Sequence, residues 1–168
     1  MASLSFVARK LRPLPRNSSI GTYVELCPNP EAEALARRAC DLLDYYGVAE
    51  AEVLQDRESG RRFLIEINAR PWIQYSLSYG SGRDFLKFLL DPGYDAARAP
   101  TRGRVWLDGP SDIFVSFSRS VGLVRHGQVS VGEYLLSLLR PGVEASFAWH
   151  DPGPWLRQLG TLIRPSRS

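Results

Sequence analysis

Residues 63–72 read FLIEINARPW, and the interpretation of the whole chain depends on this stretch. Its start is typical of a β-strand, with apolar side chains at alternate positions: Phe63, Ile65 and Ile67. Polar side chains recur at the other positions: Glu66, Asn68 and Arg70. Because successive side chains of a strand point to opposite faces, the two sets are expected on opposite faces. Pro71 then ends the strand, since it lacks an N–H to continue a ladder.

The preceding residues predict the partner strand. Residues 48–55 (VAEAEVLQ) and 61–68 (RRFLIEIN) flank the turn-rich loop DRESG, which predicts a β-hairpin. If the apolar faces of the two strands coincide, four polar side chains project from one side of it: Glu50, Glu52, Glu66 and Asn68. The loop does not fix which residues of the two strands lie opposite each other.

Three arrangements would relieve the repulsion among these carboxylates. They face bulk water, as scattered glutamates on an exposed hairpin commonly do, or they pair with arginines such as Arg9, Arg12 or Arg70, or they bind a divalent cation. A set of carboxylate and amide oxygens suits Mg²⁺ or Mn²⁺ rather than Zn²⁺. An E-x-N-x-R pattern at the end of a strand whose other face is apolar favours the metal.

The remaining segments predict an α+β fold. A helix is expected over residues 30–46, because Asn29 can cap it, Pro30 suits its first position and Gly47 can end it. Further strands are expected at residues 5–8, 20–27 and 104–107. Further helices are expected at residues 81–90, after a capping box formed by Ser130 and Glu133, and after the turn at 150–154. Residues 111–121 also favour a helix, although their alternation of Phe and Ser is compatible with a strand. Together these segments predict one mostly antiparallel sheet that carries the hairpin, with the helix over residues 30–46 packed on its apolar face.

Composition narrows the class of protein. The 168 residues are 44% hydrophobic and 23% charged, as in soluble globular proteins, and no apolar run is long enough to span a membrane. Cys27 and Cys40 form no CxxC motif, and residues 1–10 show no secretory signal pattern, so the cytoplasm is the expected location. The net charge of +3 comes with no basic stripe interleaved with aromatics, which disfavours nucleic-acid binding. His126 and His150 stand in no metal-ligand pattern.

The segment GVAEAEVLQDRESGRRFLIEINARPW resembles the C-terminal nucleotide-binding lobe of the ATP-grasp superfamily. Its surroundings, FVARKLRPLP and GTYVEL before it and SGRDFLKFLL after it, agree with that resemblance. The tail, with WLDGPSD and DPGPW, resembles the end of ATP-grasp enzymes close to D-aspartate ligase and carbamoyl-phosphate synthase-like proteins. The resemblance implies an incomplete ATP-grasp C-terminal lobe over residues 1–95 and a helical C-terminal extension over residues 96–168.

The same resemblance implies roles for individual residues. Glu52, Glu66 and Asn68 would hold Mg²⁺ or Mn²⁺, with Glu66 and Asn68 also at the nucleotide. Arg70 would act on the transferred phosphate as the catalytic residue, and Arg9 and Lys10 would contact the nucleotide or substrate. The implied activity is ATP-dependent activation of a carboxylate through an acyl-phosphate, followed by ligation to an amine or similar nucleophile.

The departures from the family pattern concern the front of the enzyme. The lobe with phosphate-binding lysines would precede residue 1, and Lys10 and Lys87 are the only lysines present. We therefore expect a fragment, a truncated product or one piece of a split enzyme, which does not catalyse ligation alone and works with a partner chain or as a homodimer. The alternative is a binding or assembly module that retains the lobe without catalysis.

Overall fold

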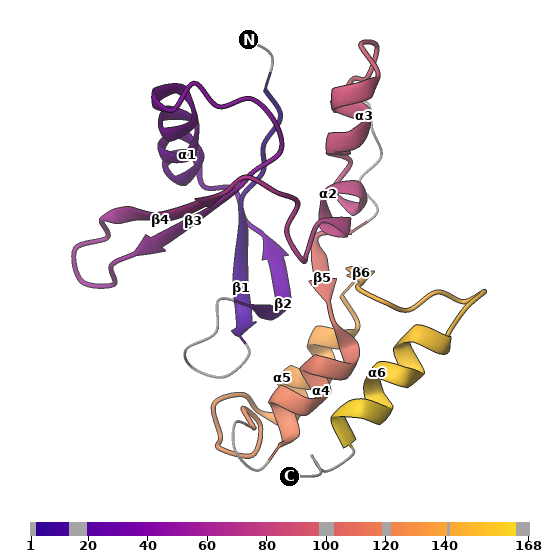
Figure 1. The fold of residues 1–168 in the computed structure, drawn as a ribbon. Helices are drawn as coiled ribbons and strands as arrows, with labels where there is room; N and C mark the ends of the chain where they lie inside the picture. The colour runs from indigo at the N-terminus through magenta and orange to yellow at the C-terminus, as the bar shows by residue number, and fades with distance from the viewer. Residues whose placement is uncertain (1–2, 14–19, 98–102, 119–121, 141, 164–168) are drawn as a thin grey trace.

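The computed structural model describes residues 3–13, 20–97, 103–118, 122–140 and 142–163. The fold is α+β, as the sequence predicts, with a mixed sheet and packed helices (Figure 1). No helix in these ranges is long and apolar enough to cross a membrane. The end of the predicted helix at 111–121 lies outside the described residues.

The central sheet has four strands in the order β1-β2-β5-β6. Their bounds are β1 (Ala8–Pro13), β2 (Gly21–Leu26), β5 (Val105–Leu107) and β6 (Gly142–Glu144). β2 pairs antiparallel with β1 and β5, whereas β6 runs parallel to β5. The sheet therefore contains strands from both regions expected from the sequence, 1–95 and 96–168. β6 has only three residues and was not predicted.

The first strand is displaced from its predicted position at residues 5–8. β1 instead covers the basic run that follows, because Lys10 and Arg12 both find carboxylate partners there. The two residues pair with consecutive positions of β2, and Leu11 between them interrupts the register as a bulge. Since consecutive residues of β2 point to opposite faces, Lys10 and Arg12 also point to opposite faces of the sheet.

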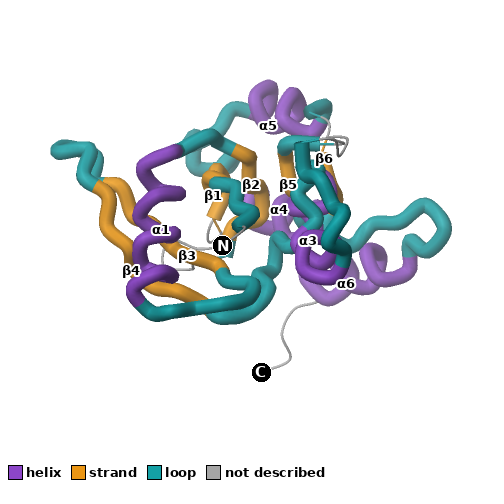
Figure 2. The backbone as a smooth tube through the Cα atoms, turned by 90° about the horizontal axis from the view of Figure 1, so that it is seen from above, coloured by secondary structure: helices purple, strands orange, loops and turns teal. Residues whose placement is uncertain are grey.

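The predicted hairpin is present and forms a sheet of its own. β3 (Glu50–Gln55) pairs antiparallel with β4 (Arg62–Asn68), and neither strand joins the central sheet. The expectation of one sheet that carries the hairpin is therefore wrong. Helix α1 (Pro30–Leu42) packs against β4 of the hairpin, and β1 and β2 lie to one side of both (Figure 2).

Helix α1 begins where the sequence predicts and ends earlier. The Asn29 side chain accepts a hydrogen bond from the Ala32 N–H, and Pro30 occupies the first turn. The helix stops at Leu42 because Asp44 takes a left-handed conformation with φ 49°, before Gly47 is reached. Three apolar residues at the end of the predicted helix are consequently exposed: Leu42 by 77%, Leu43 by 67% and Tyr46 by 61%.

The other helices follow their capping signals. They are α2 (Ser76–Gly80), α3 (Phe85–Leu90), α4 (Gly109–Phe117), α5 (Val131–Leu138) and α6 (Gly153–Ile163). The capping box of Ser130 and Glu133 at the start of α5 is confirmed. The helix predicted over 81–90 is shorter, because the Asp84 carboxylate caps α3 and fixes its start. The serine-rich run that precedes α3 forms helix α2.

The core anchors the segment that follows the E-x-N-x-R pattern. Val24 and Trp106 of the central sheet and Leu77 of α2 form a buried hydrophobic cluster. Next to it, four aromatic rings contact one another with centroids 5.4–6.4 Å apart: Phe6, Trp72, Tyr75 and Phe85. Because Trp72 lies two residues after Arg70, this cluster holds the end of the hairpin against the central sheet.

Candidate functional site

The pairing of β3 with β4 brings the predicted ligands together. Glu52 lies directly opposite Glu66, and Glu50 lies directly opposite Asn68. Residues directly opposite each other in an antiparallel pair share a face, so all four side chains lie on one face of the hairpin. The structure thus supplies the register that the sequence left open, and it agrees with the predicted grouping.

A bulge changes the rest of the predicted faces. Glu52 pairs with Glu66 while the next residue, Val53, pairs with Leu64, so Ile65 is an extra residue in β4. The bulge reverses the alternation, and Phe63 therefore shares a face with Glu66 rather than with Ile67. The prediction that Phe63, Ile65 and Ile67 form one apolar core face is wrong.

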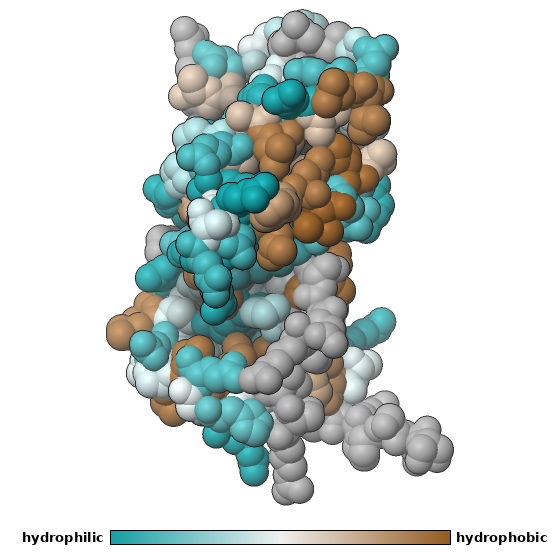
Figure 3. Space-filling model, turned by 90° about the vertical axis from the view of Figure 1, so that its left-hand side faces the viewer, coloured by the Kyte–Doolittle hydropathy of each residue, from teal (hydrophilic) through white to brown (hydrophobic). Residues whose placement is uncertain are grey.

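Exposure agrees with the corrected faces. Leu64, Val53 and Ile67 are partly buried on the side of α1, where Arg62 forms an ion pair with Glu31 of that helix. On the other face and at the bulge, three apolar side chains remain open: Phe63 is 42% exposed, Leu54 59% and Ile65 58%. Hydrophobic residues also gather on the side of the molecule where α1 and the hairpin lie (Figure 3).

Two contacts organise the acidic face. The Lys10 ammonium from β1 lies 2.6 Å from Oε1 of Glu52, and Nδ2 of Asn68 donates a hydrogen bond of 2.8 Å to Oε1 of Glu66. Lys10 therefore offsets one carboxylate of the facing pair, and the amide of Asn68 orients the other. Since Asn68 donates through its nitrogen to Glu66, its oxygen is the atom left to accept or to ligate.

Glu50 lies within the field of the same group of charges. Burial raises the pKa of Glu50 above its usual value, and the ammonium of Lys10 partly offsets the rise. Glu52 and Glu66 raise the pKa of Glu50 further, whereas Arg70 lowers it. The predicted catalytic residue Arg70 is thus close enough to influence this face, although its side chain is exposed and donates to the carbonyl of Pro71.

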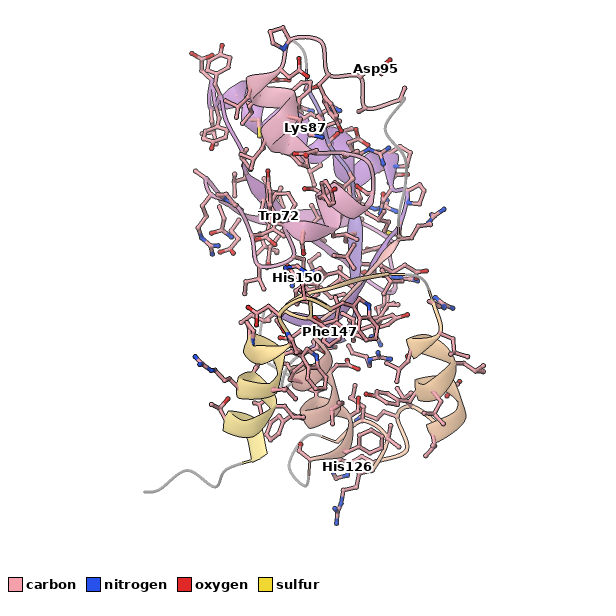
Figure 4. The ribbon with its side chains drawn as sticks, turned by 90° about the vertical axis from the view of Figure 1, so that its right-hand side faces the viewer. Trp72, Lys87, Asp95, His126, Phe147 and His150 are labelled. Atoms are coloured by element: carbon pink, nitrogen blue, oxygen red, sulfur yellow. The ribbon has the colours of Figure 1, made fainter. Side chains whose placement is uncertain are left out.

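Arg9 does not belong to the charged residues at the acidic face of the hairpin. Its side chain is 63% exposed and lies 3.8 Å from Glu25, which also accepts from Arg140 at 3.1 Å. Adjacent residues of a strand point to opposite faces, so only Lys10 of the two predicted basic contacts reaches the hairpin. Lys87 lies on α3 (Figure 4).

The donor set fits Mg²⁺ held together with a phosphate ligand, and it does not fit a cation held by protein alone. Among the described residues, no three His, Cys, Asp or Glu side chains are grouped closely enough to hold a metal ion. Mg²⁺ commonly takes only one or two carboxylates and completes its shell with water and substrate phosphates. Glu52 facing Glu66 is such a pair, and the Asn68 oxygen is a suitable third oxygen donor.

A second polar cluster, which the sequence did not indicate, is buried between the central sheet and the C-terminal helices. Arg12 Nε lies 2.7 Å from Oδ1 of Asp112 on α4, and its Nη1 donates to the Ser137 hydroxyl at 2.8 Å. Thr22 also donates to the Asp112 carboxylate. The guanidinium lies 3.9 Å from the ring centre of Tyr23 and 5.1 Å from that of Tyr134. The only sequence signal is a charged residue at position 112 within an apolar helix.

This buried cluster has a structural role. Arg12 is 5% exposed and Asp112 is 0% exposed, so neither is accessible to a ligand. Burial raises the pKa of Tyr134 to about 12, and the adjacent Asp112 carboxylate adds to the rise. The cluster ties β1, which carries Lys10, to helices α4 and α5.

The histidines are separated in the structure. His126 lies near the end of the molecule beyond α4 and α5, whereas His150 lies in the loop before α6 (Figure 4).

The chain matches no known family model, no curated protein and no solved structure.

Proposed function

We propose that the acidic face of the hairpin binds Mg²⁺ together with the phosphates of ATP, as part of an ATP-grasp ligase. One observation carries the proposal: Glu52 lies directly opposite Glu66, in register with Glu50 opposite Asn68. Facing carboxylates destabilise a strand pair unless a cation lies between or beside them. The facing carboxylates therefore support a cation-binding role, beside the partial relief that the Lys10 ammonium already gives Glu52.

Each polar residue of the acidic face has a distinct proposed role. Glu52 and Glu66 would hold the metal, with the oxygen of Asn68 beside them. The bound metal would neutralise charge on the phosphates. The Asn68 amide fixes the orientation of Glu66 through its hydrogen bond, which preorganises the ligand. Arg70 extends from the end of β4, where an exposed guanidinium can stabilise the charge of a transferred phosphate.

The reaction class follows from the resemblance of these residues to ATP-grasp enzymes. A carboxylate attacks the γ-phosphate of ATP, and the resulting acyl-phosphate is displaced by an amine or a similar nucleophile. Lys10, one of only two lysines, is engaged with Glu52. The lysines that would hold the β- and γ-phosphates are therefore expected on another lobe or chain, and ligation by this chain alone is not expected.

A second candidate function is a binding or assembly module without catalysis. It is favoured by the ion pair between Lys10 and Glu52, because this pair offsets the facing carboxylates without a metal. The exposed apolar side chains of the hairpin, Leu54, Phe63 and Ile65, are also suited to contact with another protein surface.

Calorimetric titration with ATP, in the presence and absence of Mg²⁺, tests the proposal. The chain should bind ATP only when Mg²⁺ is present, and Glu66→Gln and Asn68→Ala should each weaken binding by at least tenfold. Glu58→Gln is a matched control, because Glu58 is an exposed carboxylate in the loop of the same hairpin. Equal ATP binding with and without Mg²⁺, or no binding at all, would favour the assembly module.

A further inference from the structure

The buried cluster around Arg12 contains several unpaired polar atoms. Within the part of the chain that the structure describes, four of its buried atoms have no hydrogen-bond partner: Arg12 Nη2, Asp112 Oδ2, Ser116 Oγ and the hydroxyl oxygen of Tyr134. Buried polar groups in folded proteins are nearly always paired with protein or with an ordered water, because an unpaired group loses its hydration without compensation. Four such atoms in one cluster therefore indicate a common partner.

The ion pair between Arg12 and Asp112 uses only one of its two possible hydrogen bonds. A guanidinium that faces a carboxylate commonly forms two parallel bonds to it. Here Nε lies 2.7 Å from Oδ1, whereas Nη2, the other donor on that side of the guanidinium, does not pair with Oδ2. A donor and an acceptor are thus left open beside the same ion pair.

Two hydroxyl groups from different helices lie beside this open pair. Ser116 follows Asp112 by four residues in α4 and so lies on the same side of that helix, and Tyr134 comes from α5. Burial raises the pKa of Tyr134 to about 12, the Asp112 carboxylate adds to the rise, and the Ser116 hydroxyl lowers it. Both groups are therefore close to the Tyr134 hydroxyl, and the four unpaired atoms are neighbours contributed by β1, α4 and α5.

The cluster is closed to bulk solvent. The Arg12 guanidinium lies 3.9 Å from the ring centre of Tyr23 and 5.1 Å from that of Tyr134. These two tyrosines are only 2% and 3% exposed. Solvent at the surface therefore cannot supply the missing hydrogen bonds, and a partner has to be enclosed when the chain folds.

We infer that one water molecule is enclosed between β1, α4 and α5 as a structural component of the fold. It accepts a hydrogen bond from Arg12 Nη2, donates one to Asp112 Oδ2, and forms hydrogen bonds with the hydroxyls of Ser116 and Tyr134. A buried water typically makes about three hydrogen bonds, which these partners can supply. They disfavour an ion, because a cation would face the guanidinium and an anion would face the carboxylate. The inference is independent of the proposed function.

A high-resolution crystal structure of the unsubstituted chain tests the inference directly. One peak of electron density should lie within hydrogen-bonding distance of both Arg12 Nη2 and Asp112 Oδ2, and of at least one of the two hydroxyls. If no peak bridges these two atoms, or if Nη2 pairs directly with Oδ2, the inference is refuted.

Magnetic relaxation dispersion of water gives a second test in solution, because it counts the waters that a protein holds for long times. Three proteins are compared: the unsubstituted chain, Arg12→Met combined with Asp112→Leu, and Arg9→Met. The double variant makes the site apolar and should lose one long-lived water, whereas Arg9→Met, which removes an exposed arginine of the same strand, should lose none. No loss in the double variant, or an equal loss in Arg9→Met, would overturn the inference. The crystal structure decides the question if the double variant does not fold.

Discussion

The substitution Asp112→Asn should strongly destabilise the chain. Asp112 is fully buried, and its Oδ1 accepts from Arg12 Nε at 2.7 Å and from the Thr22 hydroxyl at 2.9 Å. An asparagine of the same shape removes the negative charge and leaves the Arg12 guanidinium buried without a counter-charge. Breaking a buried ion pair in this way costs about 3–5 kcal/mol of the free energy of unfolding.

The effect is measurable by urea unfolding followed by circular dichroism. In thermal unfolding of a chain of this length, the same loss of stability corresponds to a decrease in melting temperature of about 6–20 °C. The slope of the free energy against urea should not change, so that the difference reports stability alone. Arg9→Met is the control: it removes an arginine from the same strand, but one that is 63% exposed and 3.8 Å from its partner. That substitution should cost about 1 kcal/mol or less.

A double variant separates lost charge from lost packing. Arg12→Met combined with Asp112→Leu removes both charges and keeps apolar volume, so it should recover much of the stability lost in Asp112→Asn. The reasoning is refuted if Asp112→Asn is no more destabilising than Arg9→Met. It is also refuted if the double variant loses as much stability as the sum of its single substitutions, since the two charges would then not be coupled.

Three further predictions concern stability. The pKa of Tyr134 is about 12 in the folded chain and 10 in the unfolded chain. The stability that this shift contributes is therefore complete below pH 10 and is lost as the pH rises to 12, by up to about 3 kcal/mol. The free energy of unfolding of Tyr134→Phe, measured across this pH range, should lack that part of the loss. Ser130→Ala removes the capping box with Glu133 and should cost about 1 kcal/mol in thermal unfolding, with a contradiction if the melting temperature is unchanged. Gly80→Ala would place a Cβ against the Val143 side chain and should cost about 1–3 kcal/mol in urea, whereas an unchanged midpoint would disprove the close approach.

Local signals explain what the sequence predicted correctly. The caps at Asn29 and at Ser130 with Glu133 each satisfy backbone N–H groups through a residue three positions away, so both helix starts were readable. The hairpin was readable from its alternation and its turn-rich loop. The grouping of Glu52 with Glu66 followed from that alternation, because both residues lie on the same side of the bulge.

The remaining features depend on contacts that no local pattern contains. The bulge at Ile65 inverts the face of Phe63, and alternation assumes that no such residue is present. The ion pair of Arg12 with Asp112 joins residues 100 positions apart, so neither residue signals the other in sequence. The displacement of β1 onto the basic run has the same cause, because distant carboxylates make a strand of charged residues stable.

The central claim is that a divalent cation and a phosphate meet on the face formed by Glu52, Glu66 and Asn68. Nuclear magnetic resonance spectra recorded with Mn²⁺ and ATP test it most directly, since the paramagnetic ion broadens signals near its binding site. The account predicts broadening centred on the backbone amides of these three residues, which is lost in Glu66→Gln. Broadening centred elsewhere, or no broadening in either protein, would contradict it.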